Sequence, residues 1–129
     1  MQVRDVMNAK PATLPPGATL AEALDLMAQQ KNRHVVVVEN GAVVGIISDR
    51  DLAMFYDPVA MTRARWEQST VAQLMTPGPV SVGSGAELGA AAQMLLKHAV
   101  SALPVVDNGT LVGILSEKDF VRHFAKPAG

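Results

Sequence analysis

Two short segments of the sequence combine a hydroxyl, a cation and a carboxylate at the same spacing. The first corner, residues 48–51, reads Ser-Asp-Arg-Asp, and the second corner, residues 116–119, reads Ser-Glu-Lys-Asp. Each corner stands where an apolar run ends and a helical pattern begins. One interpretation is a helix cap, in which the Ser oxygen accepts a backbone N–H and the acid reaches back to the first turn.

The same groups can also bind a ligand. The first turn of a helix offers free N–H groups and a partial positive charge, which attract a phosphate. A Ser hydroxyl and a cation can add to this site, and a carboxylate can accept both hydroxyl groups of a ribose. Because the pattern occurs twice, both corners are candidate sites. The residues concerned are Ser48, Arg50 and Asp51 in the first corner and Ser116, Lys118 and Asp119 in the second.

A glycine precedes the Ser of each corner by three residues. Gly45 and Gly113 both stand inside apolar runs that read as strands. Glycine within a strand allows either a ligand or a neighbouring backbone to approach closely. Both alternatives are open from the sequence.

The two corners belong to an internal repeat. At an offset of 68 residues (48 to 116) the halves align without a gap. Copies of this kind often share a core, because neither buries its apolar face alone. We place repeat 1 at residues 1–56, a linker at 57–70 and repeat 2 at 71–129. Other matched pairs are Val3 with Val71, Met7 with Met75, and Asn40-Gly41 with Asn108-Gly109.

Each repeat predicts a helix, two strands and a second helix. Apolar residues at i, i+3, i+4 and i+7 mark the first helix, from Leu20 in repeat 1 and Leu88 in repeat 2. Thr19 with Glu22 predicts a capping box, and an Asn-Gly pair between β-branched runs predicts a hairpin. A hairpin with two helices cannot cover both of its faces. We therefore predict an α+β fold with the two repeats packed about a pseudo-twofold axis.

Composition narrows the function. The chain has 129 residues, a net charge of −1 and no cysteine, so it lacks a basic footprint for nucleic acid and any thiolate metal site. The N-terminus is charged where a signal peptide needs an apolar run, and the apolar runs are too short to cross a bilayer. We expect a cytoplasmic protein that binds neither nucleic acid nor membrane. The histidines lack metal-site spacing, which disfavours an enzyme.

The sequence resembles the paired cystathionine β-synthase (CBS) domains, also called a Bateman module, over essentially its whole length. The resemblance rests on "VRDVM" and "VAQLM", which open the repeats, and on "HVVVVENGAVVGIISDRD" and "SALPVVDNGTLVGILSEKD" around the corners. It implies two CBS repeats with clefts between them that bind an adenosine nucleotide (AMP, ADP, ATP or NAD(H)), and no required cofactor. Repeat 1 departs from the pattern at Val36, where repeat 2 keeps the family's proline as Pro104.

The resemblance also implies roles for individual residues. The corner Asp would hold the ribose, the corner Ser would lie near the phosphate, and Ile46 and Ile114 would flank the adenine. Because Arg33 and Arg50 both stand near the first corner, we expect that corner to bind a phosphorylated ligand more tightly. The other implied cleft residues are Lys10, Ala12, Thr13, Arg33 and His34 for repeat 1 and Val80, Ser81, Ser101 and Ala102 for repeat 2.

We therefore expect a stand-alone regulatory module that signals energy or redox state to a partner protein, with no catalytic residue and no metal. The alternative is a ligand-independent dimeric scaffold whose helix caps only look like the site. The resemblance further implies a flat homodimer formed through helical faces. The apolar side chains that we assign to this contact are Leu52, Phe55, Phe120 and Phe124.

Overall fold

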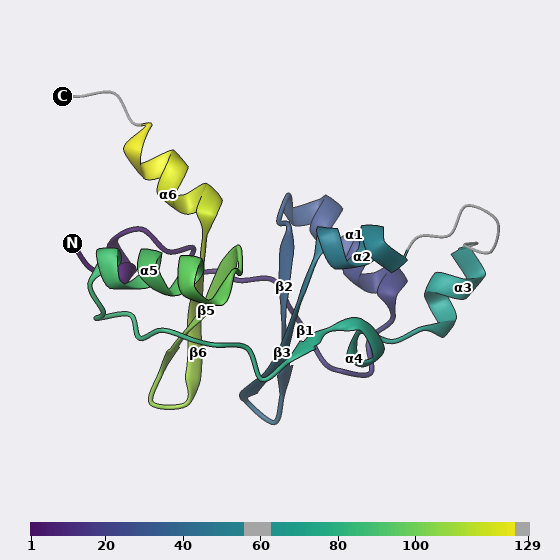
Figure 1. The fold of residues 1–129 in the computed structure, drawn as a ribbon. Coiled ribbons are helices and arrows are strands. Elements are labelled where there is room, and N and C mark those ends of the chain that lie inside the picture. The colour runs from purple at the N-terminus through teal and green to yellow at the C-terminus, as the bar shows by residue number, and fades with distance from the viewer. Residues whose placement is uncertain (56–62, 126–129) are drawn as a thin grey trace. The chain divides into compact units, whose positions relative to one another are not determined.

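The computed structural model describes residues 1–55 and 63–125, and its contacts divide the chain into two units (Figure 1). The contiguous unit is Ala12–Pro79, and the split unit combines Met1–Pro11 with Val80–Gly129. The opening segment of repeat 1 (residues 1–11) therefore packs with the hairpin of repeat 2. The opening segment of repeat 2 (residues 71–79) packs with the hairpin of repeat 1. This division by contact cuts across the repeat boundaries predicted from the sequence, and residues 57–62 of the predicted linker lie outside the described residues.

The contiguous unit contains a four-stranded sheet in the order β1-β2-β3-β4. Strand β1 runs parallel to β2, whereas β2 with β3 and β3 with β4 are antiparallel. The short outer strands come from the segments that flank the hairpin in sequence. The elements are β1 (Thr13–Leu14), α1 (Leu20–Gln30), β2 (His34–Glu39), β3 (Ala42–Ser48), α2 (Asp49–Phe55), α3 (Arg63–Gln68), α4 (Val71–Leu74) and β4 (Thr76–Pro77).

The split unit is built around the second hairpin, in which β5 and β6 are antiparallel. Single bridges extend this pair on both sides, from Asn8 to Ile114 and from Val82 to Val105. The order helix, strand, strand, helix and the α+β class are thus confirmed for both repeats. The elements are a 3-10 turn η1 (Val3–Asp5), α5 (Leu88–His98), β5 (Ala102–Asp107), β6 (Thr110–Ser116) and α6 (Glu117–Phe124).

Both hairpins turn at the Asn-Gly pairs named from the sequence. Asn40 and Gly41 have φ values of 53° and 79°, and Asn108 and Gly109 have 50° and 79°. Two successive residues with positive φ are what a tight two-residue hairpin requires, and Asn-Gly adopts them with little strain. The hairpin register, and with it the position of each corner, follows from this local chemistry.

The core of the contiguous unit is aliphatic. Val35, Val37 and Ile47 of the hairpin are fully buried with the inner face of α1. Leu52 of α2 is only 3% exposed and packs in this cluster. Our assignment of Leu52 to a dimer contact is therefore wrong, because α2 turns this side chain into its own unit. Val71, from the opening segment of repeat 2, completes the cluster.

The core of the split unit combines the opening segment of repeat 1 with the second hairpin. Val3 is fully buried with Leu103, Val105 and Leu115, and its N–H donates to the carbonyl of Ala86 (2.9 Å). Asn8 and Ile114 exchange two backbone hydrogen bonds, of 2.9 and 3.0 Å. The opening segment is therefore part of this core and not a loose terminus.

A side-chain contact fixes the entry to α5. Asp107 accepts hydrogen bonds from the Ser84 N–H (2.9 Å) and the Ser84 hydroxyl (2.5 Å). These bonds, with a smaller effect of the nearby Arg4 guanidinium, hold the pKa of the Asp107 carboxyl below its usual value. They fasten the segment before α5 to the end of β5.

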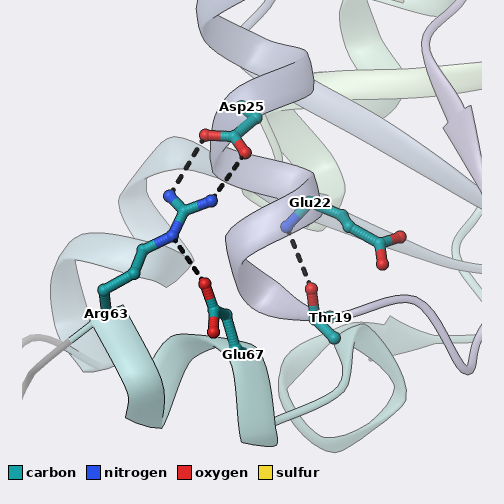
Figure 2. Close-up of polar contacts among 5 residues, drawn as sticks. All are labelled: Thr19, Glu22, Asp25, Arg63 and Glu67. Carbon is teal, nitrogen blue, oxygen red and sulfur yellow. Dashed lines mark hydrogen bonds and ion pairs between the residues drawn. The ribbon is translucent and has the colours of Figure 1, made fainter.

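Arg63, which begins α3, anchors this helix on α1 (Figure 2). Its guanidinium donates two hydrogen bonds to Asp25 (2.9 and 3.3 Å) and one to Glu67 (3.1 Å), and the bond from Arg63 lowers the pKa of Asp25. Figure 2 also shows the start of α1, where Thr19 Oγ1 accepts the Glu22 N–H (3.1 Å). The Glu22 carboxylate points away from Thr19, so only half of the predicted capping box forms.

Candidate functional site

The first corner is a reciprocal helix cap. The Ser48 N–H donates to Asp51 Oδ2 (2.8 Å), and the Asp51 N–H donates to Ser48 Oγ (3.1 Å). Both ends of the cap interpretation are therefore observed. The cap uses one carboxylate oxygen of Asp51, however, and a carboxylate has a second oxygen with two further lone pairs. Within the ranges that the structure describes, no hydrogen bond or ion pair engages Oδ1 of this half-buried side chain, which can therefore accept a further bond.

Three segments that we assigned to the first site come together around β2. The Val36 N–H donates to the carbonyl of Ala12 (2.9 Å), and Thr13 pairs with Val36 across the parallel strands. On the other side of β2, His34 pairs with Ser48. The sheet register thus gathers, within one unit, the predicted residues Ala12, Thr13, His34, Ile46 and Ser48.

The predicted cations are placed differently from one another. The carbonyl of Arg33 accepts the Asp49 N–H (2.8 Å), and Arg33 Nε lies 4.0 Å from Asp49 Oδ2. Both side chains are largely exposed, so this pair is weak and leaves Arg33 able to reorient. Arg50 is exposed on α2. Lys10 belongs to the split unit, so the structure does not group it with Ala12 and Thr13.

The second corner repeats the cap at the start of α6. The Ser116 N–H and hydroxyl both donate to Asp119 Oδ2 (2.8 and 3.0 Å), and the Asp119 N–H donates to Ser116 Oγ (3.4 Å). The carbonyl of Ser101 accepts the Glu117 N–H (3.0 Å), as Arg33 does for Asp49 in the first corner. The two corners therefore share the two backbone N–H bonds of the cap, and the second corner adds the bond from the Ser116 hydroxyl.

The surroundings of the second corner also follow the register. Ala102 pairs with Ser116, and Pro104 pairs with Ile114. The Val82 N–H donates to the Pro104 carbonyl (3.0 Å), which brings the segment 80–82 alongside β5. Of the residues assigned to this segment, Val80 is partly buried against the core and Ser81 is exposed. Lys118 is exposed on α6.

The two corner acids differ in one contact that the sequence reasoning missed. Arg122 Nη1 lies 3.7 Å from Asp119 Oδ1, and the Asp119 side chain is only 9% exposed. Asp119, Arg122 and three other residues line a small cavity of about 60 Å³ in the split unit. The i, i+3 spacing of an acid and an arginine within one helix was the available signal. The remaining lining residues are Asp5, Val6 and His123.

The space beside each corner glycine is filled by a neighbouring segment of the protein. A Cβ on Gly113 would lie 2.8 Å from the backbone oxygen of Asn8 and 2.7 Å from Met7 Sδ. A Cβ on Gly45 would meet the side chain of Met75. Of the two alternatives open from the sequence, close approach of a neighbouring segment is the one observed. Each glycine packs against a methionine of an opening segment, Met7 at Gly113 and Met75 at Gly45.

Metal-binding clusters and membrane-spanning helices are both absent from the described part of the chain. Among residues 1–55 and 63–125, no three His, Cys, Asp or Glu side chains gather where a metal ion could bind. Over the same ranges, no helix combines the length and the apolar character needed to span a membrane.

The repeat matches a known family in both of its copies. The family model described as "CBS domain" matches residues 3–57 and again 71–126, each including one corner. This chain belongs to the CBS domain family. The resemblance inferred from the corner motifs is thereby confirmed, and the two matches make the chain a tandem CBS pair.

Curated relatives contain the CBS pair in different settings. The CBS domain-containing protein YhcV of Bacillus subtilis is 34% identical over 117 residues, which cover 91% of this chain and 81% of that protein. Homoserine O-acetyltransferase of Methanococcoides burtonii and inosine-5'-monophosphate dehydrogenase of Mycobacterium tuberculosis are also 34% identical. This chain spans only 23% and 22% of those enzymes, so the match is to their CBS portion.

Solved structures show the same fold. The protein CBSX2, solved in complex with AMP, has a TM-score of 0.80 and 31% identity, with 95% of each chain covered. A putative acetoin utilization protein of Vibrio cholerae has a TM-score of 0.81 and 34% identity, covering 96% of this chain and 91% of that one. The CBS domain pair of protein MJ0100, solved with 5'-methylthioadenosine and S-adenosyl-L-methionine, has a TM-score of 0.82 and 25% identity, covering 96% and 95%.

Proposed function

We propose that this chain is a regulatory module that binds an adenosine nucleotide at its CBS corners and signals the bound state to a partner protein. The observation that carries the proposal is the doubled corner, in which an Asp completes a helix cap through one carboxylate oxygen. The second oxygen can accept a ligand hydroxyl directly at Asp51, and at Asp119 after the Arg122 guanidinium moves aside. A module of this kind needs no catalytic residue. We place its action in the cytoplasm, where a protein without cysteine suits the reducing conditions.

The ligands of the solved relatives favour the ribose as the common recognition element. AMP, 5'-methylthioadenosine and S-adenosyl-L-methionine share an adenine and a ribose diol. Only AMP carries a phosphate. A carboxylate that accepts two hydroxyl protons suits the shared part, whereas nearby cations select for phosphate. We therefore assign the ribose to Asp51 and Asp119 and the preference among AMP, ADP, ATP and NAD(H) to the cations around them.

The remaining assignments follow from position. We propose that Ser48 and Ser116, with the first-turn N–H groups, face the phosphate and that Ile46 and Ile114 flank the adenine. The side chains proposed to hold a phosphate are Arg33, Arg50 and Lys118. The segments proposed to line the first site are those of Ala12, Thr13 and His34, and those proposed to line the second site are those of Val80, Ser81 and Ser101. Lys10, which belongs to the split unit, stays a prediction from the resemblance.

Ligand binding should stabilise the folded state. With AMP, ATP, NAD or S-adenosyl-L-methionine at about a hundredfold above the dissociation constant, linkage gives about 2.7 kcal/mol. The unfolding midpoint should then rise by several degrees, measured by differential scanning fluorimetry or calorimetry. The control is the double variant Asp51→Asn with Asp119→Asn, which keeps the caps and should show a smaller rise.

One observation favours a second candidate, a ligand-independent scaffold. Both caps are complete within the protein, so neither corner needs a ligand to satisfy its backbone groups. If none of the four ligands at millimolar concentration moves the unfolding midpoint, the scaffold is the better description. Identification of small molecules that co-purify with the protein, by mass spectrometry, would give an independent answer.

We also propose that the module forms a homodimer through helices that follow the corners. Phe124 and Val121 of α6 are 75% and 68% exposed, and Met54 of α2 is 80% exposed. Exposed apolar side chains of this size are typical of interaction surfaces. Of the residues assigned to this contact from the sequence, Phe124 is still proposed as part of it. Phe120 is partly buried against the core of its own unit, and the side chain of Phe55 lies outside the described part of the structure.

The dimer is tested by mass in solution. At tens of micromolar, sedimentation should give twice the 13.6 kDa of one chain. Phe124→Glu should shift the protein toward the monomer, because burying an unpaired carboxylate in an apolar contact is unfavourable. Gln93→Glu, which adds the same charge on α5, should leave the mass unchanged. A parent protein that sediments as a monomer would contradict the assembly.

A further inference from the structure

The acid of the second corner is already engaged on both oxygens. Asp119 Oδ2 accepts hydrogen bonds from the N–H and the hydroxyl of Ser116. Asp119 Oδ1 faces Arg122 Nη1 at 3.7 Å, and only 9% of the Asp119 side chain is exposed. A ribose diol that approaches Asp119 therefore meets a carboxylate that is already paired with a guanidinium.

The first corner lacks this cation. Arg122 aligns with residue 54 in the repeat, and that residue is Met54, which is 80% exposed. Asp51 uses Oδ2 for the Ser48 N–H, and the described residues offer no ion pair to its carboxylate. The two corners thus have the same cap and differ in the residue one helical turn after the acid.

We infer that Arg122 is a specificity-determining residue that weakens ribose binding at the second corner, so that the first corner fills first. The inference rests on the proposed function. A ligand at Asp119 must displace the guanidinium, which is 63% exposed and therefore moves readily. Asp5 lines the same cavity and offers a displaced guanidinium another carboxylate. Because the Arg122 side chain is exposed and solvent screens its charge, the effect is moderate, about fivefold in affinity.

The test isolates each corner with a background variant. In Asp51→Asn, which weakens the first corner, adenosine is titrated by calorimetry with and without Arg122→Met. Adenosine is the probe because it carries the ribose but no phosphate that Arg122 could bind. We expect Arg122→Met to tighten adenosine binding about fivefold. Lys97→Met removes the same charge from an exposed site on α5 and should change nothing.

The reciprocal exchange tests the same contact at the other corner. In the Asp119→Asn background, Met54→Arg places a cation three residues after Asp51 and should weaken adenosine binding about fivefold. Ionic strength gives a readout that a purely structural role would not move. Salt screens the Arg122–Asp119 pair, so raising the salt concentration should shrink the difference in adenosine affinity that Arg122→Met produces.

The outcomes separate this inference from the proposed function. Unchanged or weaker adenosine binding in Arg122→Met would overturn the inference, while AMP binding to the parent, titrated in parallel, would leave the proposed function standing. Adenosine binding in no variant would also overturn the inference. Failure of both AMP and adenosine to bind the parent would count against both.

Discussion

Asp51→Asn should weaken the binding of an adenosine nucleotide about ten- to hundredfold and leave the fold nearly as stable as the parent. Asn keeps an oxygen in the position that accepts the Ser48 N–H, and it is itself a good capping residue. The substitution weakens ribose binding more than it weakens the cap. A carboxylate accepts two hydroxyl protons, whereas an amide offers one acceptor oxygen, and a badly paired buried hydroxyl costs about 1–3 kcal/mol.

Asp119→Asn should cost less than Asp51→Asn for a phosphorylated ligand. Arg33 and Arg50 lie at or beside the first corner, and Arg122 already engages Asp119 at the second. Isothermal titration of AMP measures both variants, and urea unfolding of each without ligand checks that the cap survives. If both variants bind AMP like the parent, the two acids are helix caps only and the ribose assignment is wrong.

Gly113→Ala should destabilise the protein by about 1–3 kcal/mol, as overpacking of a filled core usually does. The new Cβ would lie 2.8 Å from the backbone oxygen of Asn8, and this carbonyl is held by its hydrogen bond from Ile114 (3.0 Å). The backbone cannot move aside without breaking the bridge that ties the opening segment to β6. Urea unfolding of the ligand-free protein gives the free energy directly.

Gly45→Ala is the matched control at the aligned position. The three atoms nearest to its Cβ would all belong to the side chain of Met75, with Sδ the closest and Cγ at 2.9 Å, and a methionine side chain can change rotamer. The loss of stability should therefore be smaller than for Gly113→Ala. Equal losses, or a larger loss at Gly45, would mean that side-chain crowding and not the Asn8 backbone decides the cost.

The parts of the fold that could be predicted are those encoded locally. The Asn-Gly pair sets the hairpin turn through two positive φ angles, and the Ser-x-x-Asp spacing sets the cap through bonds three residues apart. Both hold in either repeat without knowledge of the rest. The grouping of the candidate residues could be predicted for the same reason. Once the turn is fixed, the register of the hairpin is fixed, and this register pairs His34 with Ser48.

The exchange of opening segments could not be predicted. Asn8 bridges to Ile114, yet the sequence is a repeat, so the first opening segment matches its own hairpin about as well as the distant one. Pairing alone does not distinguish them. Leu52 was misjudged for a related reason: an apolar residue on a short helix points inward or outward according to how the helix packs, which its local spacing does not reveal.

The exchange of opening segments also determines the order in which the two units can fold during synthesis. The contiguous unit, Ala12–Pro79, contains every strand of its sheet, so it can close while the rest of the chain is still being synthesised. The split unit cannot. Residues 1–11 must wait until β6 has emerged before Asn8 meets Ile114, and contacts of such long sequence separation form slowly. During that interval the apolar Val3 and Met7 lack the hairpin that covers them, so residues 1–11 stay exposed until β6 has been synthesised.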